Sequence, residues 1–337
     1  MKAILFKSPN NFEVAECAVP ELGDYDILIK VGACGICGTD IHILRGEHIV
    51  KFPVIPGHEF AGEVVDIGSK VSNVKVGDRV TVDPNIVDQT CFFCRRGEIH
   101  LCENLTAIGV NFDGGFAEYC RVPALQAYKV PDGVSTEEAA MAEPIACCIH
   151  GIDRAQIKSG DTVVILGAGS VGLIMTQLAR MVGAAFILVS EPNSEKRLAA
   201  ARLGADALVD PAKDDVRSEV LKATTVGADV VIESAGRPET AALSWSLARR
   251  GGRVLQFGMV SPENTISIPP YDIYYKELTV CGSFVNPHTH SRAIQLLASG
   301  RIEVATLITH KYPLEEAAEA FETSLGGSAI KTLFIPS

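Results

Sequence analysis

The sequence predicts an α/β protein in which an antiparallel, barrel-like β unit is joined to a doubly wound parallel sheet. Three observations support this fold class. A glycine-rich turn at 167–172 connects an apolar strand pattern to a helical pattern. Between about residues 160 and 285, apolar strand patterns alternate with helical stretches, as in parallel sheets. Residues 1–33 instead show short alternating runs broken by proline and glycine, which is typical of antiparallel strands.

The N-terminal region is expected to consist mainly of strands and turns, followed by one helix. Strand patterns lie at Lys2–Phe6, Ile27–Val31 and 114–130, turns lead into strands at 56–64 and 74–80, and residues 84–104 are loop-like. Ser135-Thr136-Glu137-Glu138 matches a capping box, in which serine and glutamate satisfy backbone N–H groups at a helix start. A helix should therefore begin there and end near Gly151.

The middle and C-terminal regions supply the parallel sheet and the closing elements. Buried strands are expected at Thr162–Leu166, Ala185–Ser190, Ala228–Glu233, Arg253–Phe257 and Leu278–Phe284. Helices are expected between them, including Ser170–Val182 and Glu195–Leu203, which Gly204 would end. After Pro287, two amphipathic helices and a strand are expected at Ser291–Ser299, Leu314–Ser324 and Lys331–Ile335.

The turn Gly167-Ala168-Gly169-Ser170-Val171-Gly172 has the G-x-G-x-x-G spacing of dinucleotide-binding sites. Gly167 permits the tight turn, Gly169 lets the backbone approach a pyrophosphate, and Gly172 lets helix and strand pack closely. The pyrophosphate would bind the unpaired N–H groups at the helix start, around Ser170 and Val171. Glu191, nineteen residues after Gly172, would accept hydrogen bonds from the adenosine ribose. The alternative is a strand–helix corner without a ligand.

Glu191 also bears on the choice of cofactor. A carboxylate at this site would repel the 2′-phosphate of NADP, so NAD is favoured, whereas the nearby Arg197 leaves NADP as an alternative. Ser234, Gly258 and Phe284, at the ends of later strand patterns, are further cofactor-binding candidates.

The uncharged stretch Thr162–Ala179 is long enough to suggest a membrane span. Its glycines and polar residues favour a buried βα unit instead.

Length and composition restrict the function classes. With 337 residues, the chain is long enough for about two domains. Its net charge of −11 disfavours nucleic-acid binding, and we expect neither a signal peptide nor a membrane span. A cytoplasmic protein is therefore expected. Its ten cysteines are clustered rather than spread as a disulfide framework, and in a reducing compartment such clusters indicate metal sites.

One candidate metal set comes from distant parts of the sequence: Cys37, His58, Glu59 and Glu143. A thiolate, an imidazole and a carboxylate suit Zn²⁺ and leave a position for water or substrate. Asp40 could orient the imidazole of His58 without binding the metal itself. Taken singly, each residue is more simply a buried structural side chain. The pair Cys34-x-x-Cys37 could be a redox motif, but it lacks the βαβ setting of thioredoxin-like proteins.

The second candidate set is local. Asp88, Cys91, Cys94 and Cys102 follow one another at short spacings within the 84–104 loop, as in closed structural zinc sites. Asp88 would supply an oxygen ligand beside three sulfur ligands. The alternative is three unliganded thiols on an exposed loop, which would be prone to oxidation.

Six motifs together resemble the zinc-dependent medium-chain alcohol/polyol dehydrogenases of the sorbitol dehydrogenase type. They are G-I-C-G-T-D-I-H at 35–42, P-G-H-E-F-A-G at 56–62, V-G-D-R-V at 76–80, C-x-x-C-R-R-G at 91–97, A-E-P-I-A at 142–146 and the glycine-rich turn. The resemblance covers essentially the whole chain. It implies a GroES-like catalytic domain at 1–150 and 287–337, interrupted by an NAD-binding Rossmann domain at 151–286, with the active site in the cleft between them.

The resemblance also implies roles for individual residues. Cys37, His58 and Glu59 match the catalytic zinc site, and Glu143 matches a residue that binds the zinc directly in some members and its water in others. Thr39 and His42 match a relay that takes the alcohol proton to solvent. Cys91, Cys94 and Cys102 match a structural zinc lobe, in which Asp88 replaces the first of four cysteines.

The implied reaction is the reversible oxidation of a secondary alcohol or polyol to a ketone by NAD. Val285 occupies the place of a pocket arginine in sorbitol-type members, so sorbitol itself is not expected. A phosphorylated polyol or a hydroxy amino acid is the alternative substrate, and a metal-free quinone reductase or a non-catalytic NAD-binding protein is a more distant alternative. By the same resemblance, we expect a homotetramer or homodimer, with Leu278–Phe284 as the candidate edge strand.

Overall fold

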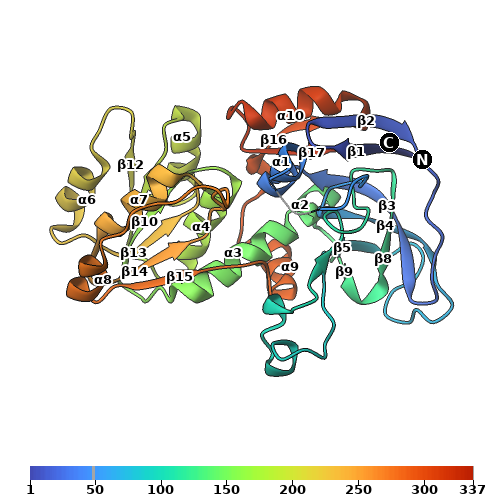
Figure 1. Ribbon diagram of the computed structural model, residues 1–337, viewed down its shortest axis with the longest axis horizontal. Helices are drawn as coiled ribbons and strands as arrows, with labels where there is room; N and C mark the ends of the chain where they lie inside the picture. Colours follow the sequence, from blue (N-terminus) through green and yellow to red (C-terminus); the bar gives the residue numbers. More distant parts are fainter. Residues whose placement is uncertain (48–49, 337) are drawn as a thin grey trace. The chain divides into compact units, whose positions relative to one another are not determined.

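The computed structural model describes residues 1–47 and 50–336, which form two compact units (Figure 1). The first unit comprises Met1–Ala146 and Asn286–Ser337, and the second comprises Cys147–Val285. The sequence analysis set the domain boundaries at 150/151 and 286/287. Within the described residues, no helix is long and apolar enough to cross a membrane.

In its described residues, the first unit is built on a seven-stranded sheet. The strand order is β16-β17-β3-β4-β5-β9, and β8 also pairs with β3. Neighbours are antiparallel except for β16 and β17, which are parallel. The strands are β3 (Asp26–Gly35), β4 (Glu59–Ile67), β5 (Arg79–Val82), β8 (Tyr119–Pro123), β9 (Ala127–Lys129), β16 (Ile308–Tyr312) and β17 (Lys331–Phe334). A separate hairpin pairs β1 (Lys2–Ser8) with β2 (Asn11–Glu16).

The helices of the first unit include one boundary that the sequence analysis got wrong. They are α1 (Gly38–Arg45), α2 (Thr136–Ala140), the start of α3 (Ala142–Ala155), α9 (His290–Ala298) and α10 (Ala317–Leu325). Ser135 caps α2 through the expected capping box. The chain then breaks at Met141 instead of continuing as one helix to Gly151. Pro144 has no N–H to donate to the carbonyl of Ala140, so a continuous helix would lose a hydrogen bond there.

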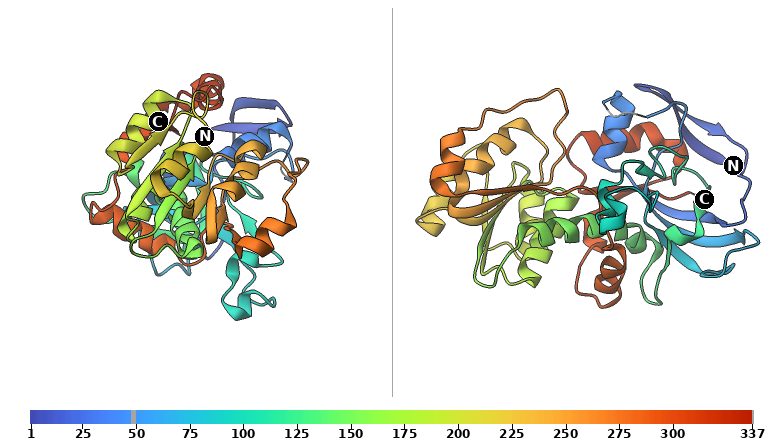
Figure 2. Two further views of the ribbon diagram at one scale, coloured as in Figure 1. Left: turned by 90° about the vertical axis from the view of Figure 1, so that its left-hand side faces the viewer. Right: turned by 60° about the horizontal axis from the view of Figure 1, so that its bottom comes forward.

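The second unit, all of which is described, contains a fully parallel six-stranded sheet in the order β12-β11-β10-β13-β14-β15. The strands are β10 (Thr162–Leu166), β11 (Phe186–Ser190), β12 (Ala207–Val209), β13 (Ala228–Glu233), β14 (Ala248–Gln256) and β15 (Thr279–Gly282). Helices cover both faces of this sheet (Figure 2); they include α4 (Ser170–Met181), α5 (Ser194–Arg202), α6 (Val216–Thr224), α7 (Pro238–Leu247) and α8 (Pro270–Lys276). The strand order reverses beside β10, and such a reversal is where ligands bind in doubly wound sheets. The predicted fold class is confirmed.

Candidate metal centres and cofactor site

Cys37 lies at the N-terminus of α1, just after β3. Its backbone N–H donates a hydrogen bond of 2.8 Å to Oδ2 of Asp40, which closes the start of the helix. The thiol therefore lies where the N–H groups of a helix favour negative charge. The sequence analysis identified Cys37 but missed α1, for which the acid three positions after Cys37 was the available signal.

Glu59 is the first residue of β4, directly after His58, and it faces Gly35 across the β3–β4 pair. Gly57 precedes them with a φ of 95°, and a Cβ on it would lie 2.4 Å from Phe116, so only glycine fits this turn. Because β3 and β4 are antiparallel neighbours, the end of one strand meets the beginning of the other. The ligand atoms of Cys37, His58 and Glu59 consequently lie within 4.8 Å of one another; we call this set the buried group.

The electrostatics of the buried group are set by Asp40. This carboxylate is fully buried, and its Oδ1 lies 3.4 Å from Nδ1 of His58, although the geometry among the described residues is not that of a hydrogen bond. Burial lowers the pKa of His58, but the charges of Asp40 and Cys37 outweigh it and raise the pKa well above its ordinary value. The imidazole is thus surrounded by groups that favour a positive charge at its position.

Lys331 is a buried neighbour of this group that the sequence analysis missed. It begins β17, and its buried ammonium group forms an ion pair with Oε2 of Glu59. Burial lowers the pKa of Lys331, but Glu59, Cys37 and Asp40 outweigh this effect and raise it. The only signal in the sequence is a lysine at the head of the closing strand, and nothing in the local pattern names its partner.

The remaining catalytic candidates lie close to the buried group in the chain but outside it. Sγ of Cys37 lies 3.7 Å from Oγ1 of Thr39, within hydrogen-bonding range for sulfur. Nδ1 of His42 lies 2.5 Å from Oε2 of Glu47, and the His42 side chain is 19% exposed. Glu143 is buried in the first turn of α3, and the described ligand atoms of the buried group do not include it.

Asp88, Cys91, Cys94 and Cys102 form the second set, which we call the loop group; their ligand atoms also lie within 4.8 Å of one another. The segment that carries it is the teal loop of Figure 1, and its ends are joined where β6 (Asn85–Ile86) pairs with β7 (Thr106–Ala107). Asp88 accepts hydrogen bonds from the N–H of Cys91 at 2.9 Å and from Nδ2 of Asn104 at 2.6 Å. These bonds hold the pKa of Asp88 below its ordinary value.

The donor types of both groups fit zinc. Zinc binds sulfur, nitrogen and oxygen at about 2.0–2.3 Å, so ligand atoms that share an ion lie about 3–4 Å apart. The buried group offers three ligands, as catalytic sites do, and the loop group offers four, as structural sites do. Desolvation and hydrogen bonds with Cys91 and Cys102 raise the pKa of Cys94 to about 12, and a cation bound beside this thiol would lower it.

The glycine-rich turn of the second unit has the geometry that a dinucleotide needs. Gly167 has a φ of 102°, and a Cβ on Gly172 would lie 2.1 Å from the carbonyl oxygen of Gly167. Gly169 caps α4, which begins with Ser170 and Val171, and a Cβ on Gly169 would meet no protein atom within 4 Å. The N-terminus of α4 is therefore open to an anion.

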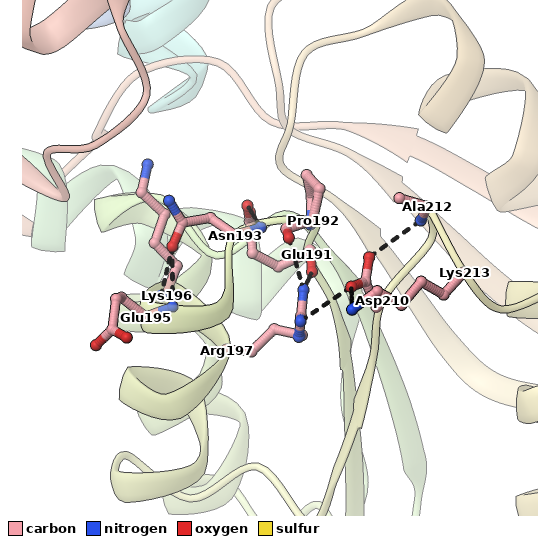
Figure 3. A network of polar contacts seen from close by, with 9 residues as sticks. All are labelled: Glu191, Pro192, Asn193, Glu195, Lys196, Arg197, Asp210, Ala212 and Lys213. Atoms are coloured by element: carbon pink, nitrogen blue, oxygen red, sulfur yellow. Dashed lines mark hydrogen bonds and ion pairs between the residues drawn. The ribbon is translucent and has the colours of Figure 1, made fainter.

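Glu191 follows β11 and is buried against this turn. Its Oε2 accepts a hydrogen bond of 2.8 Å from the N–H of Ala168. Arg197, the other residue expected to influence cofactor choice, is engaged with main-chain carbonyls and with Asp210 (Figure 3).

The three further cofactor candidates differ in their surroundings. Ser234 follows β13, and its hydroxyl donates to the carbonyl of Leu166 at 2.9 Å. Gly258 approaches the neighbouring backbone closely, because a Cβ there would lie 2.3 Å from the nitrogen of Gly236. Phe284 lies just beyond β15 and is exposed.

Comparison with known proteins extends these observations over both units. Residues 23–132 match the family described as "Alcohol dehydrogenase GroES-like domain", and residues 170–299 match "Zinc-binding dehydrogenase". The chain is 35% identical to D-arabinitol dehydrogenase 1 of Uromyces fabae, with 100% of this chain and 97% of that protein covered. It is 37% identical to D-arabitol-phosphate dehydrogenase of Enterococcus avium, with 99% and 97% covered.

A solved structure gives the same result in three dimensions. The crystal structure of a zinc-binding dehydrogenase from Sinorhizobium meliloti 1021 bound to NADP superposes with a TM-score of 0.95, at 44% identity and with 99% of each chain covered. With the fold, the two cysteine-containing groups and the glycine-rich turn all in agreement, the chain belongs to the zinc-dependent medium-chain alcohol/polyol dehydrogenase family.

Proposed function

We propose that this enzyme oxidises a secondary hydroxyl group of a polyol reversibly to a ketone, using zinc and NAD. The observation that carries the proposal is the buried group, whose three ligands leave a fourth position for substrate. The relatives named for D-arabinitol and D-arabitol-phosphate support a polyol as the substrate class.

The chain's own residues would divide the work as follows. Zinc, when bound, supplies Lewis acidity toward a hydroxyl group, and NAD supplies the hydride acceptor. Cys37, His58 and Glu59 would hold the ion. Asp40 and Lys331 would hold these ligands in position, and Glu143, which lies outside the buried group, would act through water.

The substrate proton would leave through α1. Oγ1 of Thr39, beside the Cys37 thiol, would accept it from the substrate hydroxyl group while releasing its own proton toward His42. His42, which is partly exposed and paired with Glu47, would release it to solvent.

Further parts of the proposal concern the second metal, assembly and location. The loop group would hold a structural zinc ion. In the described second unit, β15 is an edge strand, and Tyr274 of the preceding helix α8 is 80% exposed, which supports a homodimer or homotetramer. None of the ten cysteines forms a disulfide, which supports a reducing, cytoplasmic location.

A substrate panel tests the proposal. Sugar alcohols, polyol phosphates, hydroxy amino acids and simple secondary alcohols are assayed with NAD and NADP by absorbance of the reduced cofactor, after the zinc content has been measured. We expect turnover of a polyol with NAD and about two zinc ions per chain. Protein that holds zinc and binds NAD but oxidises no alcohol would contradict the proposal, and turnover restricted to polyol phosphates would favour the alternative substrate.

A further inference from the structure

We propose that Asp210 is a positioning residue for cofactor selection, which holds the guanidinium group of Arg197 away from the adenosine ribose and so favours NAD over NADP. This inference rests on the nicotinamide cofactor of the proposed function and names the residue pair that sets its selectivity.

The sequence places the cationic side chain of Arg197 close to Glu191, the residue expected to bind the adenosine ribose. Asn193 caps α5, since its Oδ1 accepts hydrogen bonds from the N–H groups of Glu195 at 2.9 Å and Lys196 at 3.2 Å. Arg197 therefore lies in the first turns of α5, only six residues after Glu191. An arginine at this place is well suited to a 2′-phosphate, because guanidinium groups bind phosphate oxygens in pairs.

In the folded structure, the guanidinium group of Arg197 is already hydrogen-bonded to other parts of the chain (Figure 3). Nη1 of Arg197 donates to the carbonyl oxygens of Glu191 at 2.5 Å and Pro192 at 2.7 Å. Nη2 donates to Oδ2 of Asp210 at 3.0 Å. The side chains of Arg197 and Asp210 are only 14% and 11% exposed, so solvent weakens this ion pair little.

Asp210 is itself held in place. It follows β12, and its Oδ1 accepts a hydrogen bond of 3.1 Å from the N–H of Ala212, while Nζ of Lys213 lies 3.3 Å from Oδ2. Burial raises the pKa of Asp210, but the bonds from Ala212, Lys213 and Arg197 outweigh it and keep the pKa below its ordinary value. The carboxylate is therefore charged at neutral pH and anchors Arg197.

Selectivity follows from the charges that remain. A phosphate monoester carries a charge of about −1.5 to −2 at pH 7. At the ribose it would meet the carboxylate of Glu191 without the compensating guanidinium group. Removing the charge of Asp210 weakens the hold on Arg197 and lets it turn to the 2′-phosphate, whereas NAD has no group there to gain. Lys196 is unchanged in every variant below, so its charge cancels in the comparison.

The test measures the dissociation constants of NAD and NADP by titration calorimetry, without an alcohol substrate. We expect Asp210→Asn to bind NADP about tenfold more tightly, the value of one charge-assisted hydrogen bond, with NAD affinity changed by less than about twofold. Adding Arg197→Ala to this variant should remove the gain. Asp161→Asn is the matched control, because Asp161 forms a similar ion pair with Arg253 of β14, at 2.8 Å and with side chains 13% and 15% exposed. Asp161 directly precedes β10, whereas Glu191 and Asp210 follow the strands β11 and β12.

Melting temperatures establish that each variant is folded, and Asp210→Ser replaces Asp210→Asn if the latter is not. Unchanged NADP affinity in a folded Asp210 variant, or a gain that persists without Arg197, would overturn the inference. Weaker NADP binding by Arg197→Ala alone would also overturn it, because Arg197 would then already reach the phosphate. A wild-type protein that binds both cofactors but oxidises no alcohol would remove only the proposed function, whereas one that binds neither would remove both.

Discussion

The buried group and the loop group bring similar ligands together in opposite ways. The loop group draws all four donors from residues 88–102, and the β6–β7 pair closes the segment that carries them. The buried group takes its donors from the N-cap of α1 and from residues 58–59 where β4 begins, and its ion-pair partner comes from β17 near the C-terminus. One site depends on a short loop and the other on the pairing of β17, β3 and β4.

This difference explains why the two groups suit different tasks. A partly exposed loop holds an ion only by surrounding it, so four ligands are needed. Around the buried group, α1 supplies Asp40 and β17 supplies Lys331 to hold the ligands, so three ligands can suffice and one position can stay open. Changes in the buried group should therefore affect catalysis, and changes in the loop group should affect mainly metal content and stability.

Cys37→Ser should have the largest effect. Loss of partners that merely support a metal ligand typically costs about 10–100-fold, so loss of a ligand should lower kcat/KM more than about a thousandfold. NAD binding should be retained, because the glycine-rich turn belongs to the second unit. Steady-state kinetics, calorimetry with NAD and zinc analysis measure the three quantities. Cys120→Ser, a buried thiol outside both groups, is the control; unchanged kinetics in Cys37→Ser would refute the assignment.

Lys331→Met should destabilise the zinc-free protein next most strongly. Removing one partner of a buried ion pair costs about 3–5 kcal/mol, because the buried carboxylate of Glu59 is left without its partner. Zinc should restore more stability in this variant than in the wild type, since the ion would replace the lost positive charge. Urea unfolding with zinc and with a chelator measures this. Equal stabilisation of both proteins by zinc would show that Lys331 is not coupled to the metal.

Asp88→Ala should act on the loop group alone. Zinc content should fall from about two ions per chain to about one, with most of the activity kept, because the carboxylate both binds metal and orders the loop. Asp88→Cys should instead bind zinc more tightly in a chelator competition. Glu98→Ala, in the same loop, is the control. If Asp88→Ala abolished activity while keeping both ions, the division of tasks between the two groups would be wrong.

His42→Ala should have the smallest effect, and one that depends on pH. We expect a slowing of about tenfold at pH 6, where removal of the substrate proton limits the rate, and little change in alkaline solution. Glu47→Gln should act in the same direction but more weakly, since Glu47 only holds the imidazole. A pH–rate profile parallel to that of the wild type would argue against the relay.

The sequence alone was most informative where the interactions are local. It predicted the first and last residues of β10 and β13 as observed. Apolar β-branched runs that are bounded by turn residues leave little choice of where a strand begins and ends. It likewise indicated the loop group from spacing and the glycine-rich turn from its position between strand and helix. It missed β12, which has three residues and too few alternations to show a pattern, and the break at Met141, where two overlapping helix signals were joined.

Only the tertiary structure decided which charges are paired. Lys331 and Glu59 are 272 residues apart, and strand pairing rather than sequence spacing makes them neighbours. Arg197 appears in the sequence as a cation available to a 2′-phosphate, yet the end of β12 brings Asp210 to it. A side chain's type is local information, whereas its partner depends on which elements pack together. The sequence therefore predicted which side chains could bind metal and cofactor. It did not predict which charged groups pair with them, because that depends on the tertiary structure.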